Sequence, residues 1–298
     1  MYYQPKDSID VVMLGSSHIH CDINTAKLWR DYGISAYDYS AAEQPLWMTY
    51  HYLVEICKTQ KPKVAVLDLY GPAHFTDEYQ YEWIQDNILG MRFSLNKLRM
   101  IFASAEPKRI PDYFPAFSYY HNRFDRLDEE DFNEILKSSK EKAAFKGYTP
   151  YFEKTVQTES EFETNEIGEL TPKSEIYLLK IMDFCKRNDI ELFFIVIPYV
   201  TEYGDELVYN RIREIANGDG TEFICSMDDY ALMGLDFSTD FNDPSHLNYD
   251  GSCKFTDFLA TKLLERCELE DHRGDPYYES WDRHVEEIDS MVREYGNK

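Results

Sequence analysis

Five apolar runs alternate along this chain with longer segments of helical hydrophobic spacing. The runs cover residues 10–14, 34–39, 63–69, 190–197 and 221–225. Short continuous apolar runs are typical of strands that are buried on both faces of a parallel sheet. Strands that alternate with helices indicate an α/β fold. We therefore predict a three-layer α/β/α sandwich around a parallel sheet of about five strands.

Polar residues mark the ends of several expected helices. Asp22 or Asn24 can cap a helix that runs to Tyr32 and stops at Gly33. Pro45 is expected at the start of a buried helix, because its missing N–H has no intrahelical partner to lose there. Further helices are expected over residues 46–57, 172–185, 206–216, 251–267 and 277–295.

The segment between the third and fourth runs has a different pattern. Residues 75–150 are rich in aromatic residues and helix formers, with several proline breaks, which predicts a helical insertion. Residues 152–170 are acidic and weakly apolar, so we expect a loop or an edge hairpin. We predict one domain over residues 1–298, with the insertion about 75–150 and a closing helix about 277–295.

The charge balance narrows the possible partners. The chain of 298 residues has 31 basic and 55 acidic side chains, a net charge of −24. Such a surface repels nucleic acid and anionic membranes but says little about a neutral sugar. With 43% hydrophobic residues, the chain can form a full core.

Cysteine usage and hydropathy bear on the compartment. The six cysteines form no close pair, so buried free thiols are expected. No apolar run reaches membrane-spanning length, and no signal peptide opens the chain. The first strand follows Met1 closely, so an anchor upstream of it would make this a cell-envelope protein, and without one we expect a cytoplasmic protein.

Two polar motifs are expected at the same edge of the sheet. The first strand ends in Gly15-Ser16-Ser17-His18, and a polar loop with Asp243 and His246 follows the last strand. Because the carboxyl ends of parallel strands meet at one edge, these motifs should lie close together. Serine needs an adjacent base, histidine can serve as one, and a carboxylate can orient the histidine.

This pairing resembles the SGNH (GDSL-like) hydrolases. The Gly15-Ser16-Ser17-His18 variant, the sequence His246-Leu247-Asn248 at the base and the helical insertion look more like the bacterial cell-envelope branch with DltD and alginate acetylation proteins. The likeness covers residues 8–75 and 172–268 and implies a flavodoxin-like fold. It implies Ser17 as the nucleophile, His246 as the base and Asp243 as its orienting acid. It also implies an oxyanion hole, with the Ser17 N–H as one donor.

Two departures from the family pattern concern the oxyanion hole. The family has a glycine after its second strand, where this chain reads Ser40-Ala41-Ala42-Glu43-Gln44. A backbone N–H of Glu43 or Gln44 can still donate. The family's Gly-x-Asn after the third strand is also missing, so the third donor stays unassigned. Losing one donor costs about 100- to 1000-fold in turnover.

Several residues remain as alternatives or pocket candidates. Ser16 is the second choice for the nucleophile, and Asp240 for the orienting acid. A pocket can also contain His18, Tyr70, His74, His121 and Asn242, and aromatic residues around Trp47, Tyr70 and Tyr119 can stack on sugars. His18, His20 and Cys21 lack a second acidic cluster, so we expect no metal site.

We therefore expect a serine esterase or acyltransferase that needs no cofactor. Its substrate would be a small-molecule or glycan ester, with an O-acetylated carbohydrate or cell-envelope polymer as the main candidate. The competing interpretation is a catalytically weak or inactive relative that binds carbohydrate or serves in envelope assembly. A phosphodiesterase is disfavoured, because the chain is acidic and has no glycine-rich phosphate loop. The acyl group, the acceptor and the oligomeric state stay open.

Overall fold

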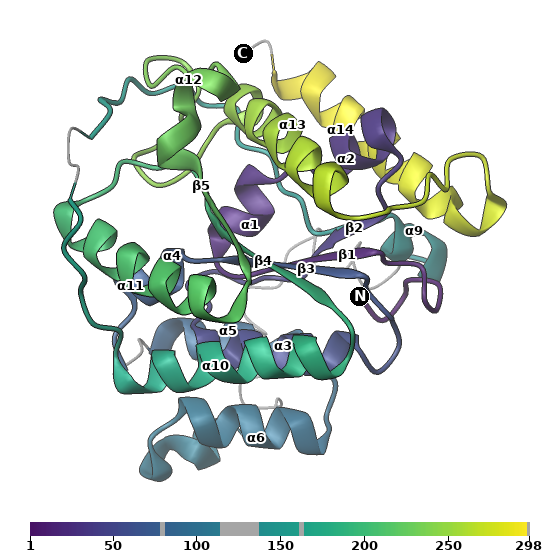
Figure 1. Cartoon of the computed structure of the whole chain (residues 1–298). Helices are drawn as coiled ribbons and strands as arrows, with labels where there is room; N and C mark the ends of the chain where they lie inside the picture. Colours follow the sequence, from purple (N-terminus) through teal and green to yellow (C-terminus); the bar gives the residue numbers. More distant parts are fainter. Residues whose placement is uncertain (78–80, 114–136, 161–163, 297–298) are drawn as a thin grey trace, which may run out of the picture.

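Five parallel strands form the single sheet of this computed structural model, which describes residues 1–77, 81–113, 137–160 and 164–296 (Figure 1). In chain order the strands are β1 (Val11–Leu14), β2 (Ala36–Asp38), β3 (Val64–Asp68), β4 (Glu191–Val196) and β5 (Glu222–Cys225). Their order across the sheet is β2-β1-β3-β4-β5, and every neighbouring pair is parallel. The predicted α/β/α fold with about five parallel strands is confirmed.

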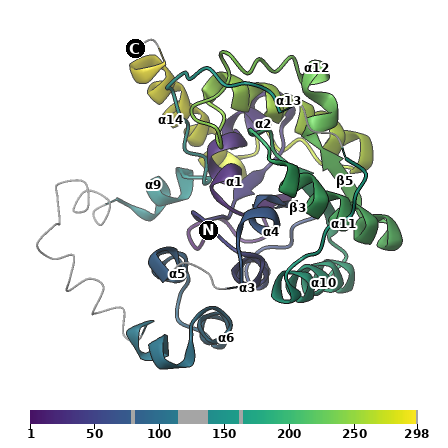
Figure 2. The same ribbon diagram turned by 90° about the vertical axis from the view of Figure 1, so that its left-hand side faces the viewer.

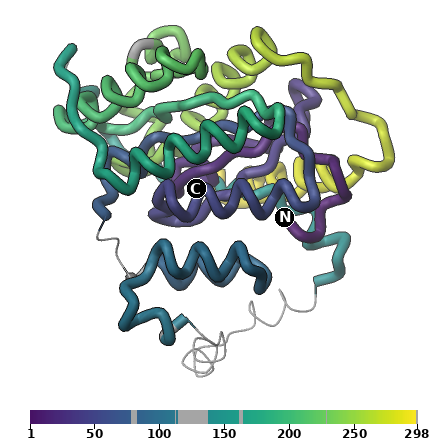
Figure 3. Tube along the Cα trace, turned by 60° about the horizontal axis from the view of Figure 1, so that its bottom comes forward, coloured from purple at the N-terminus to yellow at the C-terminus, as the bar shows by residue number. Residues whose placement is uncertain are grey.

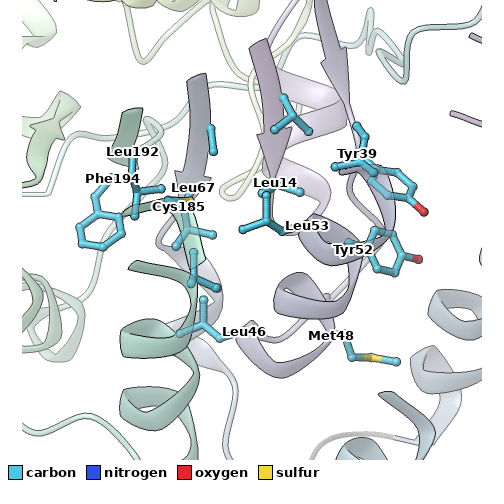
Figure 4. Close-up of a cluster of buried hydrophobic side chains, with 14 of the residues drawn as sticks. Leu14, Tyr39, Leu46, Met48, Tyr52, Leu53, Leu67, Cys185, Leu192 and Phe194 are labelled. Carbon is cyan, nitrogen blue, oxygen red and sulfur yellow. The ribbon is translucent and has the colours of Figure 1, made fainter. Parts of the chain in front are cut away.

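The apolar runs become strands because both faces of the sheet are buried. Along β1, Val12 and Leu14 face one hydrophobic cluster, whereas Val11 and Met13 face the other, as the two-residue period of a strand requires. Figure 4 shows the first cluster, in which Leu14 lies close to Leu53 of the covering helix. Continuous hydrophobic sequence is thus explained by two-sided burial.

Helices cover each face of the sheet (Figures 1 and 2). One face packs against α3 (Leu46–Ile56), α10 (Pro172–Arg187) and α11 (Tyr203–Asp219). The opposite face is covered by α1 (Ser17–Asp22), α2 (Thr25–Tyr32), α12 (Tyr230–Met233) and α13 (Tyr249–Arg266). The closing helix α14 (Glu279–Tyr295) packs on α2 and buries Trp281, His284 and Ile288. Within the described ranges, no helix is both long and apolar enough to cross a membrane.

The described part of residues 75–150 is largely helical. It contains α5 (Tyr81–Leu89), α6 (Leu95–Ser104), the 3-10 helix η1 (Pro107–Tyr113) and α9 (Ser139–Ala144), after α4 (Tyr70–His74). Helix α6 packs on α3 and forms an additional outer layer (Figure 3). His121 lies outside the described residues. Over 152–170 the described residues form a loop, with one isolated bridge from Thr155 to Phe241. Two further 3-10 helices are η3 (Ser226–Asp229) and η4 (Pro276–Tyr278).

The prediction of one helix over residues 22–32 is wrong at its start. The chain turns directly from β1 into α1, and the extended residue Ile23 separates α1 from α2. The Asn24 side chain caps α2 by accepting the N–H of Lys27, and Gly33 ends that helix in the left-handed region. Ser17, which follows the first strand, is therefore the first residue of a helix.

A close approach between neighbouring strands sets the turn from β1 into α1. Gly15 has a φ of +148°, and a Cβ placed on it would lie 2.6 Å from Cβ of Asp68 at the end of β3. Residues that carry a side chain essentially never adopt this backbone conformation. Glycine is thus required for Ser16 and Ser17 to leave the strand in the observed direction.

We expect Gly15→Ala to lower the free energy of unfolding by at least about 2 kcal/mol, because backbone strain and the contact with Asp68 add together. Urea denaturation measures this change. The matched control is Gly218→Ala in α11, where a Cβ meets nothing within 4 Å. That change should be neutral or stabilise by up to about 1 kcal/mol. Equal stability of both variants would contradict the assigned strain.

Candidate active site at the carboxyl edge of the sheet

Ser17, His246 and Asp243 form a chain of hydrogen bonds. Ser17 Oγ lies 2.8 Å from His246 Nε2. On the other side of the ring, His246 Nδ1 lies 3.1 Å from both carboxylate oxygens of Asp243. A carboxylate only accepts, so Nδ1 carries the hydrogen and Nε2 is left to accept from the serine hydroxyl. The structure thus brings together three residues that the sequence placed at opposite ends of the chain.

The loop before α13 fixes Asp243 by several donors. Its Oδ1 accepts the N–H groups of Ser245 and His246, and its Oδ2 accepts from the side chain of Asn242. Burial by itself raises the pKa of Asp243, but the hydrogen bonds from His246 and Asn242 outweigh it and keep the pKa well below its usual range. Asp243 is therefore a carboxylate. Asp240, the alternative acid, instead pairs with Lys254 at 2.6 Å.

Ser16 is held away from His246 by a buried carboxyl group. Its side chain is only 1% exposed, and its hydroxyl donates to Oδ2 of Asp68 at 2.9 Å. Asp68 also accepts the N–H of Tyr70 through its other oxygen. Burial raises the pKa of Asp68 to about 6. This arrangement gives Ser16 a structural role beside the first turn of α1.

An aromatic column lies beside the candidate triad. The His18 ring stacks on Tyr70 at 3.9 Å, and Tyr70 stacks on His74 at 4.0 Å. His18 is fully buried, and its ring lies 5.1 Å from that of His246. Burial lowers the pKa of His18 well below the usual value, so its ring is neutral next to His246. His74 Nε2 in turn lies 3.4 Å from Asp205 Oδ1.

The candidate oxyanion donors lie at the same edge. Ser17 is the first residue of α1, and the first N–H groups of a helix have no intrahelical partner. Glu43 and Gln44 lie in the loop between β2 and α3, where Glu43 has a φ of +46°. The buried Gln44 side chain donates to Thr49 at 3.0 Å. The donor roles of these residues remain a prediction.

A groove that the sequence did not predict borders the triad. It has a volume of about 1050 Å³, and Asp243 and His246 form part of its wall. Tyr151 lies edge-on to the His246 ring at 5.7 Å, and the Phe152 ring lies 5.9 Å from that of Tyr249 and 6.1 Å from that of Tyr295. Residues 150–154 follow the insertion, and nothing in their sequence signals this proximity.

The predicted sugar platform is wrong for two of its three aromatic residues. Trp47 is fully buried beneath Lys173, so no sugar can reach it. Tyr70 has both faces covered by imidazole rings. Tyr119 lies outside the described residues. The aromatic residues that line the groove are instead Tyr151, Phe152 and Tyr295.

A search of the described residues for metal ligands finds no cluster of three or more histidine, cysteine or acidic side chains that could hold an ion. His20 Nδ1 lies 2.9 Å from the hydroxyl of Ser40, in the loop after β2. The ring of His18 is engaged in stacking. These placements give the histidines of α1 packing and hydrogen-bonding roles.

Comparisons with solved structures find distant likenesses. No family model and no curated protein matches the chain. A proposed acylhydrolase from Bacteroides fragilis aligns with a TM-score of 0.43 and 9% identity, over 88% of this chain and 90% of that chain. A gut microbial diltiazem-metabolizing enzyme aligns with a TM-score of 0.31 and 14% identity, over 87% of this chain. This chain spans 48% of that enzyme.

The buried carboxyl group of Asp68 predicts a pH dependence of stability. Its pKa of about 6 in the folded protein lies above the value of about 3.9 in an unfolded chain. Asp68 therefore contributes its full stability below pH 4 and loses it as the pH rises through 6. Asp68→Asn lacks this titration. The free energy of unfolding of Asp68→Asn minus that of wild type should therefore be about 3 kcal/mol larger at pH 8 than at pH 4. Urea titrations at both pH values measure this, and a pH-independent difference would contradict it.

Proposed function

We propose that this protein is a serine esterase or acyltransferase, with Ser17 as its nucleophile. The observation that carries the proposal is the continuous hydrogen-bonded chain from Ser17 Oγ through His246 to Asp243, with distances of 2.8 and 3.1 Å. A hydroxyl group activated by a histidine that a carboxylate orients is the arrangement that acyl transfer requires. The resemblance to SGNH hydrolases in the two motifs points the same way.

In this mechanism Ser17 Oγ attacks the acyl carbonyl carbon while His246 Nε2 takes the hydroxyl proton. The carboxylate of Asp243 stabilises the imidazolium that forms. Collapse of the tetrahedral intermediate breaks the ester C–O bond, and His246 returns the proton to the leaving alcohol. Water, or a second hydroxyl in a transferase, then attacks the acyl-enzyme with His246 again as the base.

The negative charge of the intermediate would be received by backbone donors. The N–H of Ser17 and an N–H near Glu43 or Gln44 are the candidates. An asparagine donor after the third strand is missing, and Asp68 and Tyr70 occupy that strand end. Because the loss of one oxyanion donor lowers the turnover rate by about 100- to 1000-fold, we expect modest turnover on unactivated esters.

An O-acyl carbohydrate, most simply an O-acetylated glycan, is the substrate that the groove favours. Aromatic side chains suit sugar rings, and Tyr151 and Phe152 line the groove beside His246. Glu153 and Asp243 give the groove acidic groups, with Lys154 already paired to Asp250. Together with the net charge of −24, this disfavours polyanionic substrates.

A second candidate is a carbohydrate-binding or envelope-assembly protein with little or no catalysis. The specific observation in its favour is the departure from the family pattern at two oxyanion positions, after the second and third strands. Under this alternative the groove would bind the glycan without turnover. Chemical labelling of the serine separates the two candidates.

We expect wild-type protein to react with a fluorophosphonate probe and to hydrolyse p-nitrophenyl acetate. Ser17→Ala should lose the labelling completely and reduce turnover by at least about 1000-fold, because the nucleophile is gone. The matched control is Ser16→Ala, which removes the neighbouring hydroxyl and should keep the labelling, since Ser16 bonds to Asp68. Mass spectrometry of the labelled peptide identifies the modified serine.

Absence of labelling in the folded wild-type protein would favour the non-catalytic candidate. Labelling of Ser17→Ala at the wild-type rate would exclude Ser17 as the nucleophile. Loss of labelling in Ser16→Ala alone would transfer the role to Ser16.

The groove assignment predicts a substrate-size effect. Phe152→Ala should raise KM for an acetylated oligosaccharide by about 10-fold, because an aromatic contact of about 1 kcal/mol or more is lost. Its kcat/KM for p-nitrophenyl acetate should stay within about twofold of wild type, because this small ester does not need the groove. Phe102→Ala on α6, where the side chain is 63% exposed, is the control and should change neither value. Equal losses on both substrates would contradict a glycan-binding role for Phe152.

A further inference from the structure

Asp22 joins the two halves of the candidate site. It is the last residue of α1, the helix that begins at Ser17, and it is fully buried. Its Oδ1 accepts the N–H of Leu247 at 2.9 Å. Leu247 follows His246 directly in the loop of residues 240–248, which we call the base loop. One buried carboxyl group thus ties the nucleophile helix to the segment that carries the base.

The second oxygen of Asp22 faces His18. Asp22 Oδ2 lies 3.6 Å from His18 Nδ1, one helical turn earlier, and neither atom has a hydrogen-bond partner among the described residues. Burial raises the pKa of Asp22 well above its usual value, and the negative charges of Asp68 and Asp243 raise it further, whereas the hydrogen bond from Leu247 lowers it. A protonated Asp22 can keep accepting from Leu247 through its carbonyl oxygen while its O–H points to the neutral His18 ring.

Three other hydrogen bonds of the base loop lead away from α1. Asn242 N–H donates to the carbonyl of His246 within the loop, and Thr155 donates to the carbonyl of Asn242. The carbonyl of Pro244 accepts from Val200, beyond β4. None of these bonds fixes the distance between the His246 ring and Ser17. The bond from Leu247 to Asp22 instead links α1 directly to the base loop, with one end next to His246 in sequence and the other end five residues after Ser17.

We propose that Asp22 is a positioning residue, which sets the distance between Ser17 and His246 by holding the base loop against α1. This inference rests on the proposed function for its effect on activity. A misplacement of about 1 Å at a reacting centre can cost about 100-fold in rate. Asp22 touches neither substrate nor reacting atoms, so its effect should fall on the rate of reaction and not on KM.

Two substitutions of Asp22 and one control test the proposal. Asp22→Ala removes the acceptor, whereas Asp22→Asn keeps a carbonyl oxygen for Leu247. The control is Asp38→Ala. Like Asp22, Asp38 is a buried aspartate, 4% exposed, and it lies at the end of β2. Unlike Asp22, it has no hydrogen-bond partner for either side-chain oxygen among the described residues. Each variant is compared with wild type in fluorophosphonate labelling, in p-nitrophenyl acetate kinetics and in hydrogen exchange of the Leu247 amide.

We expect Asp22→Ala to slow labelling and kcat by about 10- to 100-fold with KM within about twofold, and to speed exchange of the Leu247 amide at least about 10-fold. Asp22→Asn should restore labelling to within about threefold of wild type and keep the Leu247 amide protected. Asp38→Ala should match wild type in labelling and in exchange of that amide.

A folded Asp22→Ala variant with wild-type labelling, or with unchanged exchange at Leu247, would overturn the proposal. If Asp22→Ala does not fold, Asp22→Asn decides, since a folded Asn variant as inactive as Ser17→Ala would also overturn it. Failure of the wild type to label would refute the proposed esterase function. Exchange at Leu247 requires no activity, so it would still test whether Asp22 holds the base loop.

Discussion

The close packing of Gly15 against Asp68 is the constraint on which the candidate site depends. Two neighbouring strands, β1 and β3, end at the same level, and only a residue without a side chain lets β1 turn beside Asp68. That turn places Ser16 against the Asp68 carboxyl group and makes Ser17 the first residue of α1. The direction of α1 then brings Asp22 to the base loop, so the geometry of the site follows from one contact between strands.

Burial and hydrogen bonding set different protonation states for the groups around the triad. Burial favours the neutral forms of His18 and Asp22, whereas hydrogen bonds keep Asp243 ionised. A protonated His18 would repel an imidazolium on His246, which lies 5.1 Å away. The proposed catalytic cycle creates that imidazolium, so a neutral His18 and a charged Asp243 both favour it.

The sequence predicted those features that depend on local pattern or on residue type. The strands were found because two-sided burial leaves continuous apolar runs, and the observed bounds differ from the prediction by only a few residues, as at β2 (Ala36–Asp38). The proximity of the serine motif to Asp243 and His246 was expected from their chemistry and from the rule that parallel strands end at one edge, whereas the choice of Ser17 came from the resemblance to SGNH hydrolases.

The rest could not be predicted because it depends on contacts between distant residues. The bond from Leu247 to Asp22 joins positions 225 residues apart, and in sequence Asp22 resembled a helix cap. His284 is buried against Thr25, a contact between residues 259 positions apart in the chain. Short helix α1 lacked a periodic signal, since six residues make fewer than two turns.

The aromatic column indicates from which side a substrate would approach. Tyr70 has one face against His18 and the other against His74, and Tyr199 packs edge-on to it. Rings packed this way leave little room for a ligand beside His18. The groove borders His246 on the side of residues 150–154. An ester that reaches Ser17 from the groove would place its leaving alcohol near His246 Nε2, where the mechanism needs the proton. The packing of the column and the position of the groove therefore favour approach of the proposed ester substrate along the His246 side.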